Sequence, residues 1–362
     1  MKLLFRTDVS AKIGTGHLMR CVTIAFEAQR LGWISCFVIR DPEQPTVDLL
    51  QSFGIELRIL ITKHLLQKSE PKRFAHENWL TVSQEIDAQD TLEIMNEFKP
   101  DWIIVDHYAL DKTWYKIVRK FRSKVFTIDD LGDRELDCDL LLDQNLGASE
   151  EKYKHNVPRT CNLLVGPHYA LLRDEFKEWR KKSIERRIDI DVRSVLITMG
   201  GADVENYTLG VLKELTKSKY AEKCVFKVII GGNYQYANTL NDFVQSFELK
   251  TLISTNVTNM AQIMSESDLC IGAAGSTAWE RCCLGLPTIT FAIAQNQIDL
   301  LNFMTENYIT SASNLEKICD DFDFLIGEDQ KSRLKQLSRN SSAICDGRGV
   351  GRVLRQLEQG SD

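Results

Sequence analysis

The sequence lacks several features that would place it in a specialised class of protein. No stretch approaches the ~20 consecutive apolar residues that a membrane-spanning helix needs. The first eight residues, "MKLLFRTD", contain too short an apolar run for a signal peptide. The formal net charge is −6 and no basic stripe stands out, which argues against nucleic acid as a partner. These absences predict a soluble cytoplasmic protein that acts on a small molecule.

Metal and redox motifs are also missing. The 362 residues include ten cysteines, but none of them form a CxxC pair, so zinc sites and redox motifs have little support. Most of the cysteines lie in apolar surroundings, as is typical of buried thiols in a reducing compartment. We therefore expect no cofactor and no required metal.

What is present is an alternation of short apolar strands with helical patterns, over a length that favours two domains. The alternation predicts two Rossmann-like α/β domains, each with a parallel sheet covered on both faces. We expect an N-terminal α/β domain over residues 1–170, a charged connector over 171–190, and a C-terminal α/β domain with a final helical segment over 191–362. Ligands of such sheets bind beyond the carboxyl ends of the strands.

The first strand-to-helix loop, "KIGTGHLMRC" (12–21), contains a Gly-x-Gly turn formed by Gly14 and Gly16. A dinucleotide-binding fingerprint would need a third glycine where Met19 stands, and a strand that ends directly before the loop. The loop is therefore a poor candidate for an NAD site. The two glycines would instead let the backbone pass close to a ligand at the start of a helix.

His17 follows this turn directly. The positive end of the helix favours a neutral imidazole, which can accept a proton from water and act as a general base. Asp8 is close in sequence and could orient His17 or hold a sugar hydroxyl. The alternative is that His17 only caps the helix or packs against its neighbours.

In the second half, "GAAGSTAWERCCLGLP" (272–287) places small residues between a strand and a helix. The backbone N–H groups and hydroxyls of Ser276 and Thr277 can hold a diphosphate, with help from the helix dipole. Glu280 follows on the same side and can accept two hydrogen bonds from a ribose diol. The alternative is a capping arrangement that only stabilises the helix.

Three further groups of polar or small residues follow predicted strands. Gly200 and Gly201 form a turn that can approach phosphate or base, although a lone glycine pair is a weak signal. Asn296 or Gln297 in "AQNQ" (294–297) could bind sugar hydroxyls or acetamido groups. The third group, at the end of the strand in "VDHY" (105–108), consists of Asp106, His107 and Tyr108, for which functional and structural interpretations both stay open.

Taken in chain order, these motifs resemble the UDP-2,4-diacetamido-2,4,6-trideoxy-β-L-altropyranose hydrolases of pseudaminic acid biosynthesis. The matches extend from Arg6 to about Arg352, and spore-coat polysaccharide proteins share several of them. The motifs are "RTDVSAKIGTGHLMRC" (6–21), "VDHYALD" (105–111), "IDDLGDR" (128–134), "YALLRDEF" (169–176), "GGAD" (200–203), "NMAQIMSESDLCIGAAGSTAWERCCLGLPTI" (259–289), "NQ" (296–297) and "DGRGVGRV" (346–353).

The resemblance implies a GT-B glycosyltransferase-like fold with an interdomain cleft and UDP in the C-terminal domain. It also implies inverting, metal-independent hydrolysis of the bond between the sugar and UDP, with His17 activating water. The residues that the resemblance implies in substrate binding are Asp8, Tyr108, Ser276, Thr277, Glu280 and Asn296. From the glycine turns described above, we expect Gly16, Gly200 and Gly201 to bind the substrate as well. A GT-B glycosyltransferase and a non-catalytic sugar-nucleotide-binding protein are the alternatives.

Overall fold

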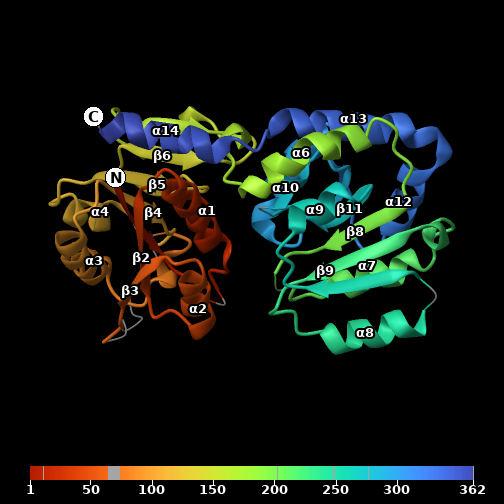
Figure 1. Ribbon diagram of the computed structural model, residues 1–362, viewed down its shortest axis with the longest axis horizontal. Coiled ribbons are helices and arrows are strands. Elements are labelled where there is room, and N and C mark those ends of the chain that lie inside the picture. Colours follow the sequence, from red (N-terminus) through yellow and green to blue (C-terminus); the bar gives the residue numbers. More distant parts are fainter. Residues whose placement is uncertain (11, 64–73, 202, 248, 276, 362) are drawn as a thin grey trace. The chain divides into compact units, whose positions relative to one another are not determined.

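The computed structural model describes residues 1–362 except 11, 64–73, 202, 248, 276 and 362. The chain forms two compact units, one of Met1–Leu171 with Gly349–Asp362 and one of Leu172–Arg348. Each unit contains one parallel sheet, as the alternation of strands and helices predicts (Figure 1). Among the described residues, no helix is long and apolar enough to cross a lipid bilayer.

The first unit has a seven-stranded sheet in the order β3-β2-β1-β4-β5-β6-β7. Its strands are β1 (Lys2–Thr7), β2 (Ile34–Arg40), β3 (Glu56–Leu60), β4 (Trp102–Asp106), β5 (Lys124–Ile128), β6 (Leu140–Asp143) and β7 (Asn162–Val165). Its helices are α1 (Gly16–Arg30), α2 (Gln44–Ser52), α3 (Gln84–Phe98), α4 (Lys112–Val118), α5 (Glu150–Tyr153) and α14 (Gly349–Ser361), with 3-10 turns η1 (Glu77–Trp79) and η2 (Pro167–Tyr169).

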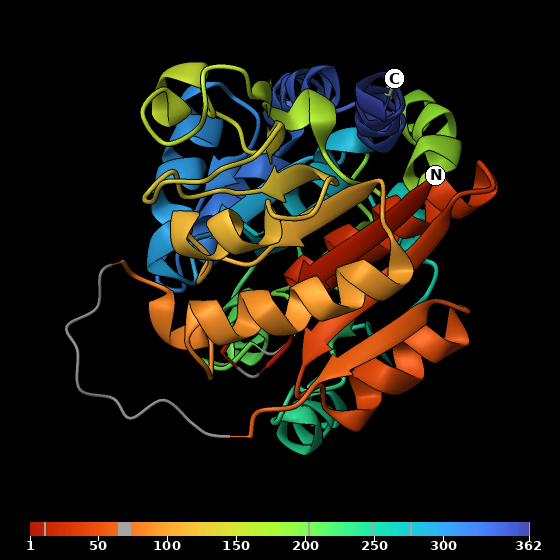
Figure 2. The same ribbon diagram turned by 90° about the vertical axis from the view of Figure 1, so that its left-hand side faces the viewer.

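Successive side chains of a strand point to opposite faces of the sheet, and β1 shows how this builds two cores. Leu3 and Phe5 belong to one buried cluster, which includes residues of α1 and α14. Leu4 belongs to the other, which includes residues of α3 and α4. Figure 2 shows α3 lying across its face of the sheet. Because both faces are covered, the strands are continuous apolar runs rather than alternating ones.

The last helix, α14, packs against the first unit, whereas the expected C-terminal domain extended to residue 362. Its apolar stripe, including Val353 and Leu357, joins the same cluster as Leu3. Trp102 Nε1 donates a hydrogen bond of 3.1 Å to the carbonyl oxygen of Leu357. The chain therefore passes between the units twice, because an amphipathic helix packs against whichever apolar face it reaches.

The second unit has a six-stranded sheet in the order β10-β9-β8-β11-β12-β13. Its strands are β8 (Ser194–Thr198), β9 (Val225–Ile230), β10 (Thr251–Thr255), β11 (Leu269–Ala273), β12 (Thr288–Phe291) and β13 (Ser311–Ala312). Its helices are α6 (Asp174–Arg186), α7 (Tyr207–Leu215), α8 (Ala237–Ser246), α9 (Met260–Ser265), α10 (Thr277–Cys283), α11 (Ile298–Glu306), α12 (Ile318–Ile326) and α13 (Lys331–Ile344), with 3-10 turns η3 (Ala221–Lys223), η4 (Gln295–Gln297) and η5 (Glu328–Gln330). The expected connector largely corresponds to α6.

Both sheets begin in the middle, extend outward on one side, and then return to the middle strand. The direction of strand addition therefore reverses between β1 and β4 in the first unit, and between β8 and β11 in the second. Such a reversal opens a crevice at the carboxyl ends of the two strands, where ligands of α/β sheets bind. The predicted site residues follow these four strands, except Asn296, which follows β12.

A buried ion-pair network holds the first unit together around Asp87 of α3. This carboxylate accepts hydrogen bonds from Arg6 Nε at 3.0 Å and Arg40 Nε at 3.0 Å, and from Trp114 Nε1 at 2.9 Å. Both Asp87 and Arg6 are fully buried. The network therefore joins α3 to β1, β2 and α4 through one carboxylate.

Replacing Asp87 by alanine should leave two buried guanidinium groups without this partner. We expect the free energy of unfolding to fall by about 3–5 kcal/mol, as for other buried ion pairs that lose one member. Urea unfolding measures the change. The matched control is Glu151→Ala, which removes an exposed ion pair with Lys154 and should cost less than about 1 kcal/mol. Equal losses in the two variants would contradict the importance of the network.

Candidate functional site

The first unit brings His17 of α1 and Asp106 of β4 together at the crevice between β1 and β4. His17 Nδ1 and Asp106 Oδ1 are 2.6 Å apart. Because an ionised carboxylate only accepts hydrogen bonds, Nδ1 carries the proton and donates it. No described residue forms a hydrogen bond with Nε2 of His17, so this nitrogen keeps its lone pair for another molecule.

Arg20, one helical turn after His17, keeps Asp106 ionised. Its guanidinium donates to both carboxylate oxygens of Asp106, from Nε at 3.0 Å and from Nη2 at 2.8 Å. Burial would raise the pKa of Asp106, but the charge of Arg20 and the hydrogen bonds from Arg20 and His17 outweigh burial and lower it. Arg20 also donates to Asp130 at 2.6 Å. Asp106 is therefore a fixed anion that orients the imidazole ring.

Aromatic rings surround the imidazole of His17. Tyr108 meets it edge-on, with ring centroids 4.5 Å apart, and donates its hydroxyl to Asp130. Trp79 also meets the ring edge-on at 5.7 Å and stacks on Tyr108. Burial, and then the charge of Asp130, raise the pKa of Tyr108 well above its usual value, so its hydroxyl stays protonated. Trp79 was not predicted, since residues 61–90 show no regular pattern.

Asp8 does not contact His17, so the interpretation that it orients the imidazole is wrong; Asp106 has that position. Asp8 accepts hydrogen bonds from Arg6 at 2.5 and 2.9 Å, from the Arg40 N–H at 2.8 Å, and from His107 Nε2 at 3.0 Å. His107 Nδ1 in turn accepts the N–H of Ala109, which places the imidazole proton on Nε2. Burial would raise the pKa of Asp8, but Arg6 and His107 hold it well below its usual range.

Asp8 does line a cavity of about 360 Å³ in the first unit. Arg40, Asn78, Trp79 and Thr81 contribute to the same cavity. Trp79 also contacts the ring of His17, although His17 itself does not line the cavity. Gly16 opens α1 nearby in the chain, with open space where a Cβ would stand.

In the second unit, the predicted glycine pair follows β8. Gly200 has a φ of +94°, which favours glycine, and a Cβ added to Gly200 or to Gly201 would meet no other atom within 4 Å. Gly201 packs closely on the chain after β9, where a Cβ on Gly231 would lie 2.0 Å from the Gly201 carbonyl oxygen. The chain after β9 therefore packs against the backbone of this turn, while the side-chain positions of Gly200 and Gly201 face open space.

The loop after β11 contains the predicted nucleotide segment. Ser276 lies outside the described residues, and Thr277 opens α10. Thr277 Oγ1 accepts a hydrogen bond of 3.1 Å from Arg281, which also donates to the Ala273 carbonyl oxygen at 2.7 Å. Sequence reasoning missed Arg281, because a charged residue on a short helix is more typical of a solvated face.

Glu280 lies on the same helix, and its nearest described cation is Arg173, with Nη2 3.8 Å from Oε1. Burial raises the pKa of Glu280 to about 7, against the lowering effect of Arg173. Gln297 of η4 reaches the same region, since its Nε2 lies 3.9 Å from where a Cβ of Gly275 would stand. Asn296 lies in the same short turn.

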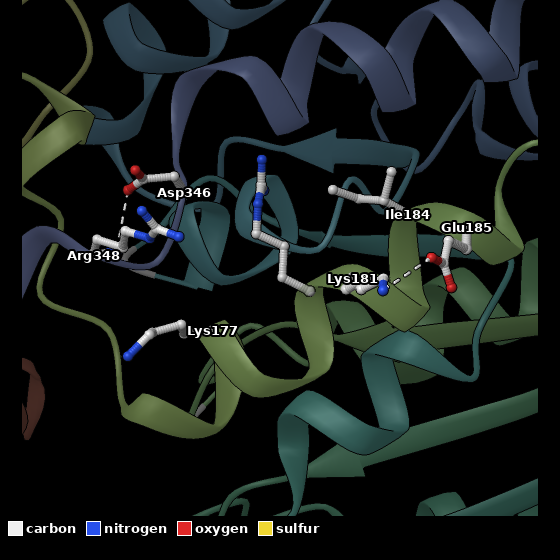
Figure 3. Close-up of a pocket in the computed structure, with 7 residues that line it drawn as sticks. Lys177, Lys181, Ile184, Glu185, Asp346 and Arg348 are labelled. Atoms are coloured by element: carbon white, nitrogen blue, oxygen red, sulfur yellow. Dashed lines mark hydrogen bonds and ion pairs between the residues drawn. The ribbon is translucent and has the colours of Figure 1, made fainter.

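A larger hollow of about 450 Å³ lies between α6 and residues 346–348 of the second unit (Figure 3). None of the predicted site residues lines it. Arg180, which does, donates to the carbonyl oxygens of Cys345 and Ser342 and so serves packing. Lys181 is paired with Glu185 at 3.9 Å. This hollow therefore has the character of a surface groove between charged side chains.

The chain is similar to several known proteins. Residues 194–302 match the Glycosyltransferase family 28 C-terminal domain. The chain is 26% identical, over 94% of its length and 71% of the relative, to an uncharacterized protein of Methanocaldococcus jannaschii. It is also 26% identical, over 76% of its length and 86% of the relative, to the UDP-2,4-diacetamido-2,4,6-trideoxy-beta-L-altropyranose hydrolase of Campylobacter jejuni. The predicted resemblance to this hydrolase family is confirmed.

The fold is confirmed as well. The structure resembles that of Acinetobacter baumannii MurG with a TM-score of 0.67 and 12% identity, over 99% of this chain and 100% of that one. The chain thus has the two-domain GT-B architecture. At this identity the likeness concerns the fold alone, because one fold hosts many functions.

The raised pKa of Glu280 predicts a pH-dependent stability that its glutamine variant lacks. Between the usual value of 4.5 and about 7, the unfolded chain ionises Glu280 but the folded chain does not. The contribution of the Glu280 carboxyl to the free energy of unfolding is thus fully present below pH 4.5 and declines as the pH rises to 7. The free energy of unfolding of Glu280→Gln, taken relative to that of the wild type, should therefore increase by on the order of 2 kcal/mol between pH 4.5 and pH 8.

Urea unfolding at the two pH values measures this gain. The matched control is Glu178→Gln on the exposed face of α6, for which we expect no pH-dependent difference from wild type. A Glu280→Gln variant that tracks wild type at both pH values would show that Glu280 ionises normally in the folded chain.

Proposed function

We propose that the protein hydrolyses a UDP-sugar at the anomeric carbon, releasing UDP and the free sugar. The proposed substrate is UDP-2,4-diacetamido-2,4,6-trideoxy-β-L-altropyranose, the compound in the name of the Campylobacter relative. The observation that carries the proposal is the imidazole of His17, which is bound through Nδ1 to Asp106 and has Nε2 without a described protein partner.

In the proposed mechanism, Nε2 of His17 takes a proton from a water molecule. The water oxygen forms a bond to the anomeric carbon while the bond from that carbon to the phosphate oxygen breaks, and UDP leaves with the electron pair. Attack from the face opposite UDP inverts the anomeric centre. Asp106 stabilises the imidazolium that forms, since Nδ1–H already donates to its carboxylate. A diphosphate is a good leaving group, so no metal is required in this proposal.

The sugar would lie beside His17, with Tyr108 and the cavity of Asp8 and Trp79 as its surroundings. Tyr108 and Trp79 offer ring surfaces that exclude water from the sides of the imidazole. The backbone beside Gly16 would approach the substrate, because no side chain fills that space.

The nucleotide would bind in the second unit, at the crevice between β8 and β11. The open turn at Gly200 and Gly201 would approach the diphosphate, together with the hydroxyls of Ser276 and Thr277. Glu280 would accept hydrogen bonds from the ribose hydroxyls, and Asn296 would hold an amide or hydroxyl of the ligand. Support comes from the family 28 match, which covers this whole region of the second unit.

Glycosyl transfer is the second candidate function, favoured by that same family match. Transfer and hydrolysis share the nucleotide site and differ in the nucleophile. An assay without any acceptor other than water therefore distinguishes them.

We expect purified protein to convert the proposed substrate to UDP and free sugar in water, with EDTA present, as followed by NMR. The initial signal of the product anomer should show inversion. His17→Ala should lower the rate by about 10²–10⁴-fold, the range that a general base supplies, while UDP still binds. Full hydrolysis by His17→Ala would exclude His17 as the base, and absence of turnover by the wild type without an acceptor would favour transfer.

Asp106→Asn tests the orientation of the imidazole. An asparagine amide can donate its N–H to Nδ1, which moves the ring proton to Nε2 and removes the lone pair that accepts from water. We expect kcat/KM to fall by about 100-fold or more, as loss of an orienting carboxylate does in other His–Asp pairs. The matched control is Asp130→Asn, since Asp130 contacts Arg20 and Tyr108 but not His17, and its loss should be far smaller. Equal effects would contradict the assigned role of Asp106.

A further inference from the structure

Arg281 is a buried cation with neutral partners only, among the described residues. It is 2% exposed, and its two hydrogen-bond acceptors are the Thr277 hydroxyl and the Ala273 carbonyl oxygen. None of the described carboxylates forms an ion pair with it. In the first unit, by contrast, the buried Arg6 and Arg20 each meet two carboxylates. A buried charge is costly unless it is compensated, and no described carboxylate lies within ion-pair distance of Arg281 to compensate it.

The guanidinium of Arg281 lies at the carboxyl ends of β8 and β11. A Cβ added to Gly272 of β11 would stand 2.8 Å from Arg281 Nη1 and 2.9 Å from the carbonyl oxygen of Thr198, the last residue of β8. The strand order reverses between these two strands, and this is the position at which α/β sheets bind ligands. Gly200 and Gly201, which follow β8, leave open space beside their backbones.

A second buried arginine of this unit shows what a purely structural role looks like. Arg187 is 4% exposed and also has no ion pair among the described residues, but it donates to the carbonyl oxygens of Ser183, Met264 and Ser267 and to the Ser183 hydroxyl. These bonds join α6 to α9 and the residues after it through backbone acceptors, although Nε of Arg187 has no hydrogen-bond partner among the described residues. Arg281 has fewer acceptors and lies at the carboxyl ends of β8 and β11, where the strand order reverses.

We infer that Arg281 supplies the positive charge that holds the diphosphate of the nucleotide, acting at the Thr277 hydroxyl. This inference rests on the proposed nucleotide site. Thr277 Oγ1 accepts from Arg281, which leaves the hydroxyl proton to donate to a phosphate oxygen. The helix α10 has seven residues, and its dipole supplies at most about half a charge, whereas arginine carries a full one. Arg281 is thus a positioning and charge-supplying residue for the leaving group.

The test compares the affinities of the protein for UDP and for uridine. Calorimetry measures UDP binding directly and uridine binding by displacement. Arg281→Met should weaken UDP binding about 10- to 100-fold, the range for hydrogen bonds to charged groups, and change uridine binding less than about twofold. Arg187→Met is the matched control: it also removes a buried guanidinium, and it should leave the affinities for both ligands unchanged. A merely structural role for Arg281 would weaken both ligands together.

UDP affinity of Arg281→Met within twofold of wild type would overturn the inference, and so would equal losses for UDP and uridine. A wild-type protein that binds no UDP would instead overturn the proposed nucleotide site itself, which keeps the two failures distinct. If Arg281→Met does not fold, Arg281→Lys and Thr277→Val decide. Introduced alone, Thr277→Val should weaken UDP binding about fivefold. Introduced into a protein that already carries Arg281→Lys, it should weaken UDP binding less than twofold, because the two side chains act together. Equal losses of UDP affinity in the two backgrounds would overturn the inference.

Discussion

The hydrogen bond from His17 Nδ1 to Asp106 Oδ1 is the interaction on which the chemistry proposed for the first unit depends. It joins the first turn of α1 to the end of β4, two segments that are 89 residues apart in the chain. The strand order makes β4 the neighbour of β1, so the loop after β1 and the end of β4 meet at one crevice. Arg20 then holds Asp106 as an anion. The imidazole consequently has one nitrogen bound to the protein and the other available to a substrate water.

The two units treat buried charge differently, and the difference matches their proposed roles. In the first unit, the carboxylates of Asp8, Asp87 and Asp106 each have arginine partners, so the charges around the proposed base are balanced within the protein. In the second unit, Arg281 meets only neutral oxygen atoms of the described residues at the crevice. A site whose own charges are balanced suits a neutral sugar and water, whereas an unbalanced cation suits a diphosphate.

Local patterns made part of this structure predictable. The alternation of apolar strands and helices indicated two parallel sheets, and the Gly-x-Gly turn before His17 marked the loop that reaches Asp106. One of the two interpretations of Asp8, as the residue that orients His17, is wrong because sequence proximity does not show which strands become neighbours. Trp79 was missed in an irregular segment, and Arg281 because its burial depends on how α10 packs. The placement of α14 on the first unit depends on tertiary contacts between residues that are far apart in sequence.

The most direct test of the central claim is the tautomer of His17, read from the ¹⁵N chemical shifts of its two ring nitrogens at neutral pH. The chain has six histidines, and His17→Gln identifies the signals of this one. The account predicts a neutral ring with the proton on Nδ1 and an unprotonated Nε2, and the Asp106→Asn variant should lose that pattern. A wild-type ring with its proton on Nε2 would contradict the account, because no lone pair would then face the water.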